Sequence, residues 1–88
     1  MTREDLLRQQ LLKLRNNYIK FMAEDLSKGW DLDFVEMDGF QGYLMIKNQF
    51  KDIENIEEIL DEFGFIVDYN KHTLMLNTTK RVSFSKAM

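Results

Sequence analysis

The side chains of this sequence that are best suited to chemistry or binding are carboxylates that lie close together along the chain. The stretch DIENIEEILDEFG, residues 52–64, contains six acidic residues and no basic one. It fits three interpretations: a solvated face, a docking surface for a basic groove of another protein, or a face neutralised by basic residues within a dimer. The candidate protein-binding residues are Glu54, Glu57, Glu58, Asp61 and Glu62.

A second acidic group has some likeness to a cation-binding loop, but its spacing is wrong. A calcium loop needs oxygen ligands at alternate positions, a glycine at the sixth position and a glutamate at the twelfth. The sequence does not follow this pattern, and we therefore expect no metal site there. The four residues concerned are Asp31, Asp33, Glu36 and Asp38.

The other residue types that support catalysis lack the partners that catalysis needs. His72, the only histidine, lies next to a predicted turn, and no acidic residue is locally placed to orient it. The serines lack the context of a nucleophile elbow, and the four glycines form no phosphate-binding loop. The sequence therefore predicts neither a catalytic site nor a cofactor, and we expect that the protein is not an enzyme.

The basic residues provide an alternative interpretation, in which the protein binds nucleic acid. The net charge of −3 divides unevenly, with +2 on residues 1–29, −9 on residues 30–70 and +4 on residues 71–88. The low isoelectric point of about 5.1 argues against this alternative, because nucleic-acid modules are usually basic. The candidate nucleic-acid residues are Arg8, Lys13, Arg15, Lys20, Lys80 and Arg81.

The first element that positions these side chains is a long helix over about residues 2–28. Thr2 is a suitable N-cap with Asp5 three residues further on, and Gly29 suits a left-handed C-cap. Apolar residues at helical spacing form one broad face, which packs on a sheet or pairs with a helix of another copy. In the second case the protein is a structural subunit. The candidate oligomer face consists of Leu7, Leu11 and Leu14.

A β-hairpin is expected next, in WDLDFVEMDGFQGYLMIKN, residues 30–48. Asp38-Gly39 suits a two-residue type I′ turn, because both residues tolerate positive φ angles. Gly42 is a candidate for a β-bulge in the second strand. The apolar face of this hairpin would contain Trp30, Leu32, Phe34, Tyr43 and Met45.

The acidic stretch is predicted to be a helix over residues 52–63, with Asp52 as its N-cap and Gly64 as its stop. Its buried stripe would comprise Ile53, Ile56, Ile59, Leu60 and Phe63. A second hairpin follows, turns near Asn70-Lys71 and is succeeded by a tail, residues 78–88, that adds an edge strand or frays. One face of this hairpin would contain Phe65, Val67, Tyr69, Leu74 and Leu76.

Together these patterns predict a single small α+β domain over residues 1–88, with the order α-β-β-α-β-β and an optional last strand, and with two helices covering an antiparallel sheet. The chain has no cysteine, its N-terminus is charged and it has no long apolar run, so we expect a cytoplasmic protein without a membrane partner. The abundance of residues with AT-rich codons is typical of low-GC bacteria and their phages. We therefore expect a small acidic regulatory protein that docks on another macromolecule, for example a phage-type inhibitor or modulator of a host enzyme.

Overall fold

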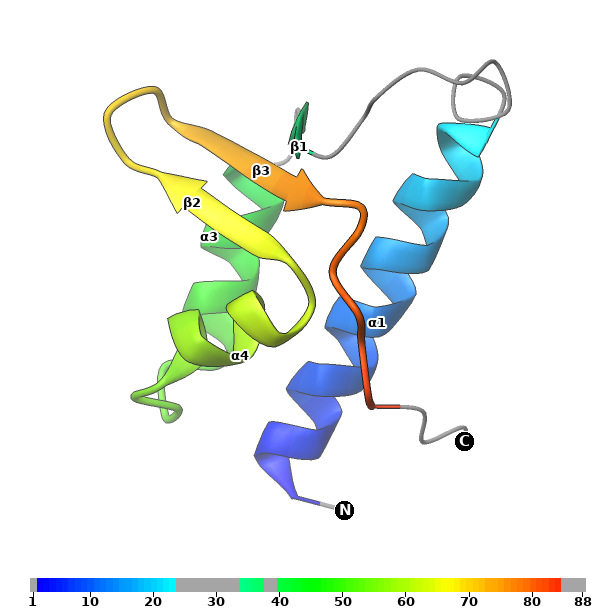
Figure 1. Cartoon of the computed structure of the whole chain (residues 1–88). Coiled ribbons are helices and arrows are strands. Elements are labelled where there is room, and N and C mark those ends of the chain that lie inside the picture. Colours follow the sequence, from blue (N-terminus) through cyan, green and yellow to red (C-terminus); the bar gives the residue numbers. More distant parts are fainter. Residues whose placement is uncertain (1, 24–33, 38–39, 85–88) are drawn as a thin grey trace.

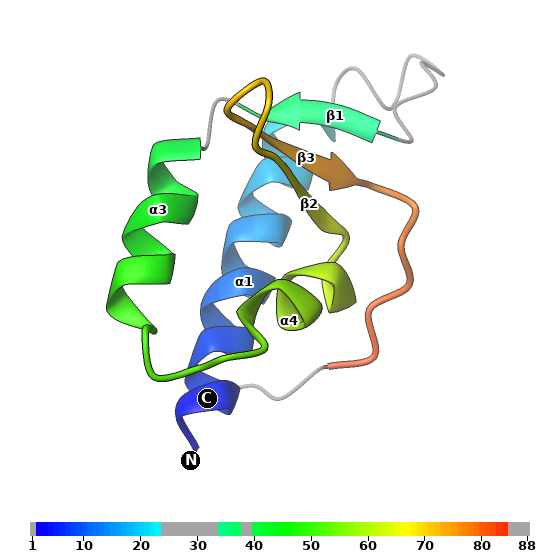
Figure 2. The same ribbon diagram turned by 90° about the vertical axis from the view of Figure 1, so that its left-hand side faces the viewer.

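The computed structural model describes residues 2–23, 34–37 and 40–84, and for residues 34–37 it describes the backbone alone. These parts of the chain form three helices and a three-stranded antiparallel sheet, which confirms the α+β class (Figure 1). The element order is α1-β1-α3-α4-β2-β3, which differs from the predicted order. The three helices lie on one side of the sheet (Figure 2).

Helix α1, Arg3–Phe21, begins where the sequence predicts. The Oγ1 atom of Thr2 accepts a hydrogen bond from the backbone N–H of Asp5 at 3.0 Å, which satisfies one of the donors left open by the first turn. Helix α1 ends at Phe21, with Met22 as its C-cap, sooner than the predicted end at residue 28. The predicted C-cap Gly29 lies outside the described residues.

The prediction of a hairpin over residues 30–48 is wrong. Strand β1, Phe34–Met37, is present, but the segment expected to pair with it forms helix α3, Phe40–Gln49. The helix buries Tyr43 completely and exposes Met45, whereas the predicted strand placed both on one face. Gly42 therefore lies in a helix and not at a β-bulge. Asp38 and Gly39, the predicted turn, lie outside the described residues.

Strand β3, Thr73–Asn77, is the centre of the sheet. It pairs antiparallel with β1 on one side and with β2, Phe65–Asp68, on the other, which gives the strand order β1-β3-β2. The predicted hairpin of β2 and β3 is confirmed, and Phe65 lies opposite Leu76 in its register. The turn is stabilised by Asp68, whose Oδ1 atom accepts hydrogen bonds from the backbone N–H groups of two residues, Asn70 and Lys71.

Helix α4, Ile56–Glu62, is shorter than the predicted helix over residues 52–63, and its N-cap is Asn55. Its amphipathic pattern is confirmed, because the five apolar residues of the predicted stripe are all buried. Asp52 is not the N-cap. It instead binds Arg3 of α1, with 3.1 Å between Oδ2 and Nε, and the Arg3 guanidinium also lies over the Phe50 ring.

The C-terminal tail is described as far as Phe84 and forms no strand up to that residue, so the predicted edge strand is wrong there. Arg15 holds the tail to α1, because its guanidinium donates four hydrogen bonds of 2.9–3.1 Å to backbone carbonyl groups. The four acceptors belong to Phe63, Asn77, Thr78 and Lys80. The Phe84 ring also packs edge-on against the Phe63 ring.

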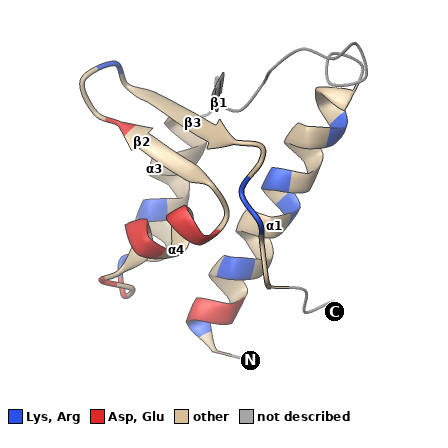
Figure 3. Ribbon diagram, in the orientation of Figure 1, with Lys and Arg blue, Asp and Glu red and all other residues tan. Residues whose placement is uncertain are grey.

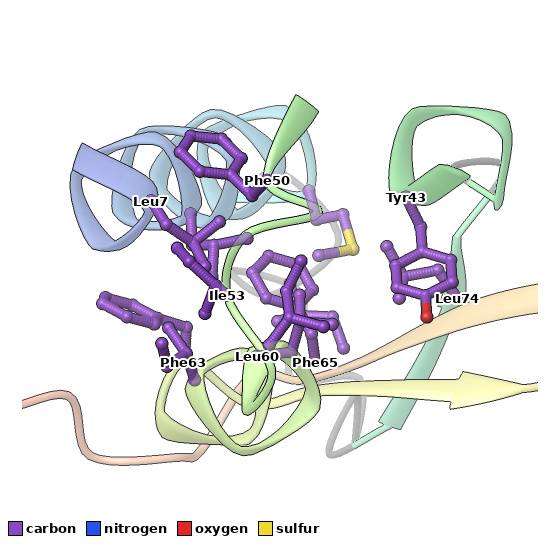
Figure 4. Packing of buried hydrophobic residues seen from close by; sticks show 13 residues of the cluster. Leu7, Tyr43, Phe50, Ile53, Leu60, Phe63, Phe65 and Leu74 are labelled. Carbon is purple, nitrogen blue, oxygen red and sulfur yellow. The ribbon is translucent and has the colours of Figure 1, made fainter. Parts of the chain in front are cut away.

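The hydrophobic core lies between the helices and the inner face of the sheet (Figure 4). Each helix contributes to it, and so do the residues that connect α3 to α4. The fully or almost fully buried side chains are those of Leu7, Leu11, Tyr43, Phe50, Ile59, Leu60, Phe63, Phe65, Leu74 and Leu76. The core therefore fixes α4 with its apolar stripe inward and its carboxylates outward.

Candidate protein-binding surface

The five predicted protein-binding carboxylates all lie on the exposed side of α4 or just before it, and we call them the acidic surface. Glu54, Glu57, Glu58, Asp61 and Glu62 are exposed, while their apolar neighbours in sequence are buried. Figure 3 shows acidic residues gathered on α4, with basic residues spread along α1. Helix α4 has no basic residue in its last turn, where a positive charge would be favoured by the helix dipole. The acidic surface is therefore electrostatically unbalanced within its own helix.

One member of the acidic surface, Glu62, is neutralised within the chain. Arg8 of α1 approaches it with 3.2 Å between Nη2 and Oε2, and the hydrogen bond that Arg8 donates to Glu62 raises the pKa of the Arg8 guanidinium. Arg8 also lies 3.8 Å from Asp5. The contact between Arg8 and Glu62 joins α1 to the C-terminal end of α4. The expected neutralisation by basic residues thus occurs for Glu62 inside one molecule, without a second copy.

A second member, Glu57, is held in place by two tyrosines. Its Oε1 atom accepts hydrogen bonds from the hydroxyl of Tyr43 on α3, at 3.4 Å, and from the hydroxyl of Tyr69 after β2. The two hydroxyls also lie 2.7 Å apart. The hydrogen bond to Glu57 is the main reason why the pKa of Tyr69 is raised from its usual value, with the bond to Tyr43 second. Lys47 adds its ammonium over both tyrosine rings, 5.8 Å from each centroid.

Two shallow hollows border Glu57. One, of about 200 Å³, lies between α4 and β2. The other, of about 320 Å³, lies where the start of α4 meets α3. The first is lined by Glu57, Leu60, Asp61, Phe65, Ile66 and Val67. The second is lined by Lys47, Glu54, Asn55, Ile56, Glu57 and Glu58. Glu57 therefore stands between two concave regions that each have carboxylates and apolar groups in their walls.

The remaining three carboxylates of the acidic surface, Glu54, Glu58 and Asp61, have no ion pair with any described residue within 4.0 Å. Carboxylates spaced four residues apart on a helix repel one another by a few tenths of a kcal/mol. The arrangement is thus slightly unfavourable for the isolated domain. A basic group placed between α4 and its neighbours would remove this repulsion.

The predicted nucleic-acid residues do not act as one set. Arg15 is 5 % exposed, and burial lowers the pKa of its guanidinium, so its assignment to a nucleic-acid face is wrong. Its donors are used by the four backbone carbonyls at the end of α4, at the end of β3 and in the tail. Arg8 is engaged with Glu62. Lys13, Lys20 and Arg81 are exposed, and Lys80 is half-buried.

The predicted oligomer face is also largely inside the molecule. Leu7 and Leu11 are fully buried in the core, and Leu14 is half-buried against it. The leucine-rich half of α1 packs on α4 and the sheet of its own chain, which leaves it unable to form the interface with another helix. The assignment of Leu7 and Leu11 to an oligomer face is therefore wrong, whereas that of the half-buried Leu14 stays a prediction.

His72 and the acidic group of residues 31–38 were not expected to form a catalytic or metal site, and two findings concern them. His72 is exposed in the β2–β3 turn with φ of 55°, and its ring meets the Phe40 ring edge-on at 5.4 Å. Among the described residues, no group of three or more histidine, cysteine or acidic side chains is placed to hold a metal ion. Asp31, Asp33 and Asp38 lie outside that part of the chain.

Tyr43, Tyr69 and Lys47 are site residues that the sequence did not indicate. Tyr43 lies in a segment predicted as a strand that forms α3, and the sequence places Tyr69 only on one face of the second hairpin. Their contacts with Glu57 join α3, α4 and the end of β2, so no pattern of residue spacing along the chain predicts them.

Comparison of the chain with protein-family models, with curated proteins and with solved structures finds no match. Within the described part of the chain, no helix is both long enough and apolar enough to cross a membrane.

Proposed function

We propose that this protein is a small regulatory binding protein that docks through its acidic surface onto a basic surface of another protein. The observation that carries the proposal is the exposure of Glu54, Glu58 and Asp61 on one side of the molecule, without an ion-pair partner among the described residues. Suitable partners include an enzyme whose basic groove normally holds nucleic acid. Complementary charge of this kind accelerates encounter and selects the partner.

Two features distinguish this surface from a face that serves only solubility. The Glu57 carboxylate is oriented by Tyr43 and Tyr69, so less conformational entropy is lost when it binds a cationic group. The two hollows beside it offer concave, partly apolar walls. Lysine and arginine side chains have apolar stems and charged ends, and both parts find complementary groups there.

The test compares two variants that raise the net charge equally at different places. The first variant removes three carboxylates from the acidic surface and leaves Glu57, with its tyrosine contacts, unchanged. It combines E54Q, E58Q and D61N. The control adds three positive charges to exposed positions of α3. It combines Q41K, M45K and N48K.

Each tagged protein is used to capture partners from a nuclease-treated lysate of its native cells, and the affinity for a captured partner is then measured with purified components. We expect the wild type and the α3 control to retain one stoichiometric partner at low salt, and the acidic-surface variant to lose it. Retention of that partner by the acidic-surface variant would contradict the proposal. Capture that occurs only in a parallel lysate without nuclease would instead favour nucleic-acid binding through Lys13, Lys20 and Arg81.

A further inference from the structure

Strand β2 has one side that no described strand occupies, because the sheet order places it at an edge. The backbone N–H of Asn77 donates to the carbonyl of Gly64 at 2.7 Å, and Phe65 lies opposite Leu76. In an antiparallel ladder this makes Phe65 and Leu76 a non-hydrogen-bonded pair, and the pattern then alternates. The N–H and C=O groups of Phe65 and Val67 consequently point to the open side of β2.

The open side of β2 borders the hollow of about 200 Å³ between this strand and α4. Figures 1 and 2 both show α4 alongside β2, with the chain reversing direction between them. The apolar lining comes from Leu60 and the residues of β2, and the carboxylates of Glu57 and Asp61 complete it. An edge strand with free backbone groups is a template for a further strand, and β2 carries no lysine or proline of the kind that commonly protects such an edge.

The spacing of the two carboxylates matches that of an extended chain. Glu57 and Asp61 are separated by four residues of α4, a rise of about 6 Å. Alternate side chains of a β-strand project on the same side and lie about 6.8 Å apart. An added strand with basic residues at two alternate positions would therefore place one cation near each carboxylate. Its intervening residues would lie on the outer face of the sheet beside Ile66, which is 40 % exposed.

We propose that β2 accepts an extended segment of the partner protein as an additional strand, with two alternating basic side chains that reach Glu57 and Asp61. This inference rests on the proposed function, and it names the mode of binding and the sequence pattern that is recognised. Main-chain hydrogen bonds to Phe65 and Val67 supply affinity, and the alternating charges supply specificity. The occupant is another protein and not the tail of a second copy, because Arg15 and Phe63 already hold this chain's own tail.

The experiment uses three blocked, fluorescently labelled peptides as probes of the intact chain. The first contains Thr-Lys-Val-Lys-Val-Thr, the second has the same composition in the order Thr-Lys-Lys-Val-Val-Thr, and the third is the first peptide with methylated backbone nitrogens on its pairing edge. Anisotropy titrations measure affinity, and amide hydrogen exchange measures protection of Phe65 and Val67. We expect the first peptide to bind at least about tenfold more tightly than the other two and to slow exchange at both amides.

The Val67→Pro variant tests the same edge from the side of the protein. The N–H of Val67 points away from β3, so proline at this position removes a donor for the partner without removing a bond of the β2–β3 ladder. We expect it to weaken binding of the first peptide about tenfold. The Asp61→Asn variant should weaken the same peptide and reduce the salt dependence of its binding. The methylated peptide decides the matter independently if Val67→Pro does not fold.

Different results would overturn different claims. Equal binding of the alternating and permuted peptides, without protection of Phe65 and Val67, would overturn strand addition. If the acidic-surface variant still lost its captured partner, the proposed docking function would survive that result. Association of the protein with itself in place of peptide binding would make a second copy the occupant and would overturn the inference.

Discussion

Gly64 leaves room for the guanidinium of Arg15: a Cβ atom at residue 64 would lie 3.1 Å from Nη1 of Arg15. The same Cβ atom would lie 2.6 Å from the backbone carbonyl oxygen of Asn77, which itself accepts a hydrogen bond from Arg15. Gly64 also has a φ of 82°, a conformation that residues with a Cβ atom seldom adopt. Gly64 therefore lies where the chain passes from α4 to β2, and its lack of a Cβ atom leaves space for Arg15, which holds the tail.

Replacement of Gly64 by alanine should destabilise the protein by about 1–3 kcal/mol, because both the backbone conformation and the contact with Asn77 oppose a Cβ atom. Gly42→Ala provides a matched control. Gly42 lies in α3 with nothing within 4 Å of an added Cβ atom. Alanine there should stabilise the protein by roughly 0.5–1 kcal/mol. Urea unfolding of the two variants gives the comparison, and a neutral Gly64→Ala would contradict this account.

Replacement of Arg15 by methionine should cost about 2–4 kcal/mol, because four backbone carbonyls lose the Arg15 donor and those left buried without another donor are unsatisfied. The Asn77 carbonyl keeps one other donor, the backbone N–H of Lys80 at 3.3 Å. Arg15→Lys should recover little of this loss, since a single ammonium cannot match the planar guanidinium that reaches four acceptors. Lys13→Met, at an exposed site of the same helix, should stay within about 0.5 kcal/mol of the wild type. Denaturant unfolding measures all three, and amide exchange at residues 78–80 should accelerate in the Arg15 variants alone.

The parts of the fold that the sequence predicted correctly depend on local signals. The Thr2 cap, the amphipathic face of α4, the stop at Gly64 and the second hairpin all follow from short-range patterns of polarity and turn chemistry. The exposure of the acidic surface follows from the same local pattern. These features required no knowledge of which elements meet in space.

The error over residues 40–49 shows how one strong turn signal misleads. Asp38-Gly39 favours a hairpin, and the apolar run after it fits a strand as well as a helix. Phe40, Tyr43 and Phe50 also lie at helical spacing, and burial of Tyr43 and Phe50 against α1, α4 and the sheet decides in favour of the helix. β1 then pairs with β3, a partner some forty residues away in sequence. Tertiary packing overrides local preference here.

The contacts of the candidate site could not be predicted from the sequence, because they also join elements that are distant along the chain. Glu57 is fixed by hydroxyl groups from α3 and from the end of β2, and Glu62 by an arginine of α1. Arg15 looked like a surface cation because most arginines are exposed. Its four backbone acceptors come from the end of α4, the end of β3 and the tail, which meet only in the folded chain. Such long-range pairs have no periodic signature.

Burial of Leu11 predicts a large stability loss on truncation that does not depend on protein concentration. Leu11→Ala should cost about 2–5 kcal/mol through lost burial and the cavity left behind. Leu44→Ala, at a position that is 41 % exposed, should cost well below that and serves as the control. Unfolding is measured at two widely different protein concentrations. If the loss at Leu11 grew on dilution or the wild type itself became less stable, α1 would be contributing to an interface between copies.

The hydrogen bonds around Glu57 predict an unusual alkaline titration of Tyr69. Its pKa is raised above the usual 10.0 because the Glu57 carboxylate, and secondly Tyr43, bind the protonated hydroxyl. The resulting stabilisation is complete below the usual pKa and is lost as the pH rises through the raised pKa. In the near-ultraviolet absorbance of tyrosinate, one of the three tyrosines should therefore titrate later in the folded protein than in the urea-unfolded chain. Tyr69→Phe should remove this late transition, and Glu57→Gln should move it to lower pH. The control Tyr18→Phe should leave it in place. A late transition that persists in Tyr69→Phe would show that the Glu57 carboxylate is not held by Tyr69.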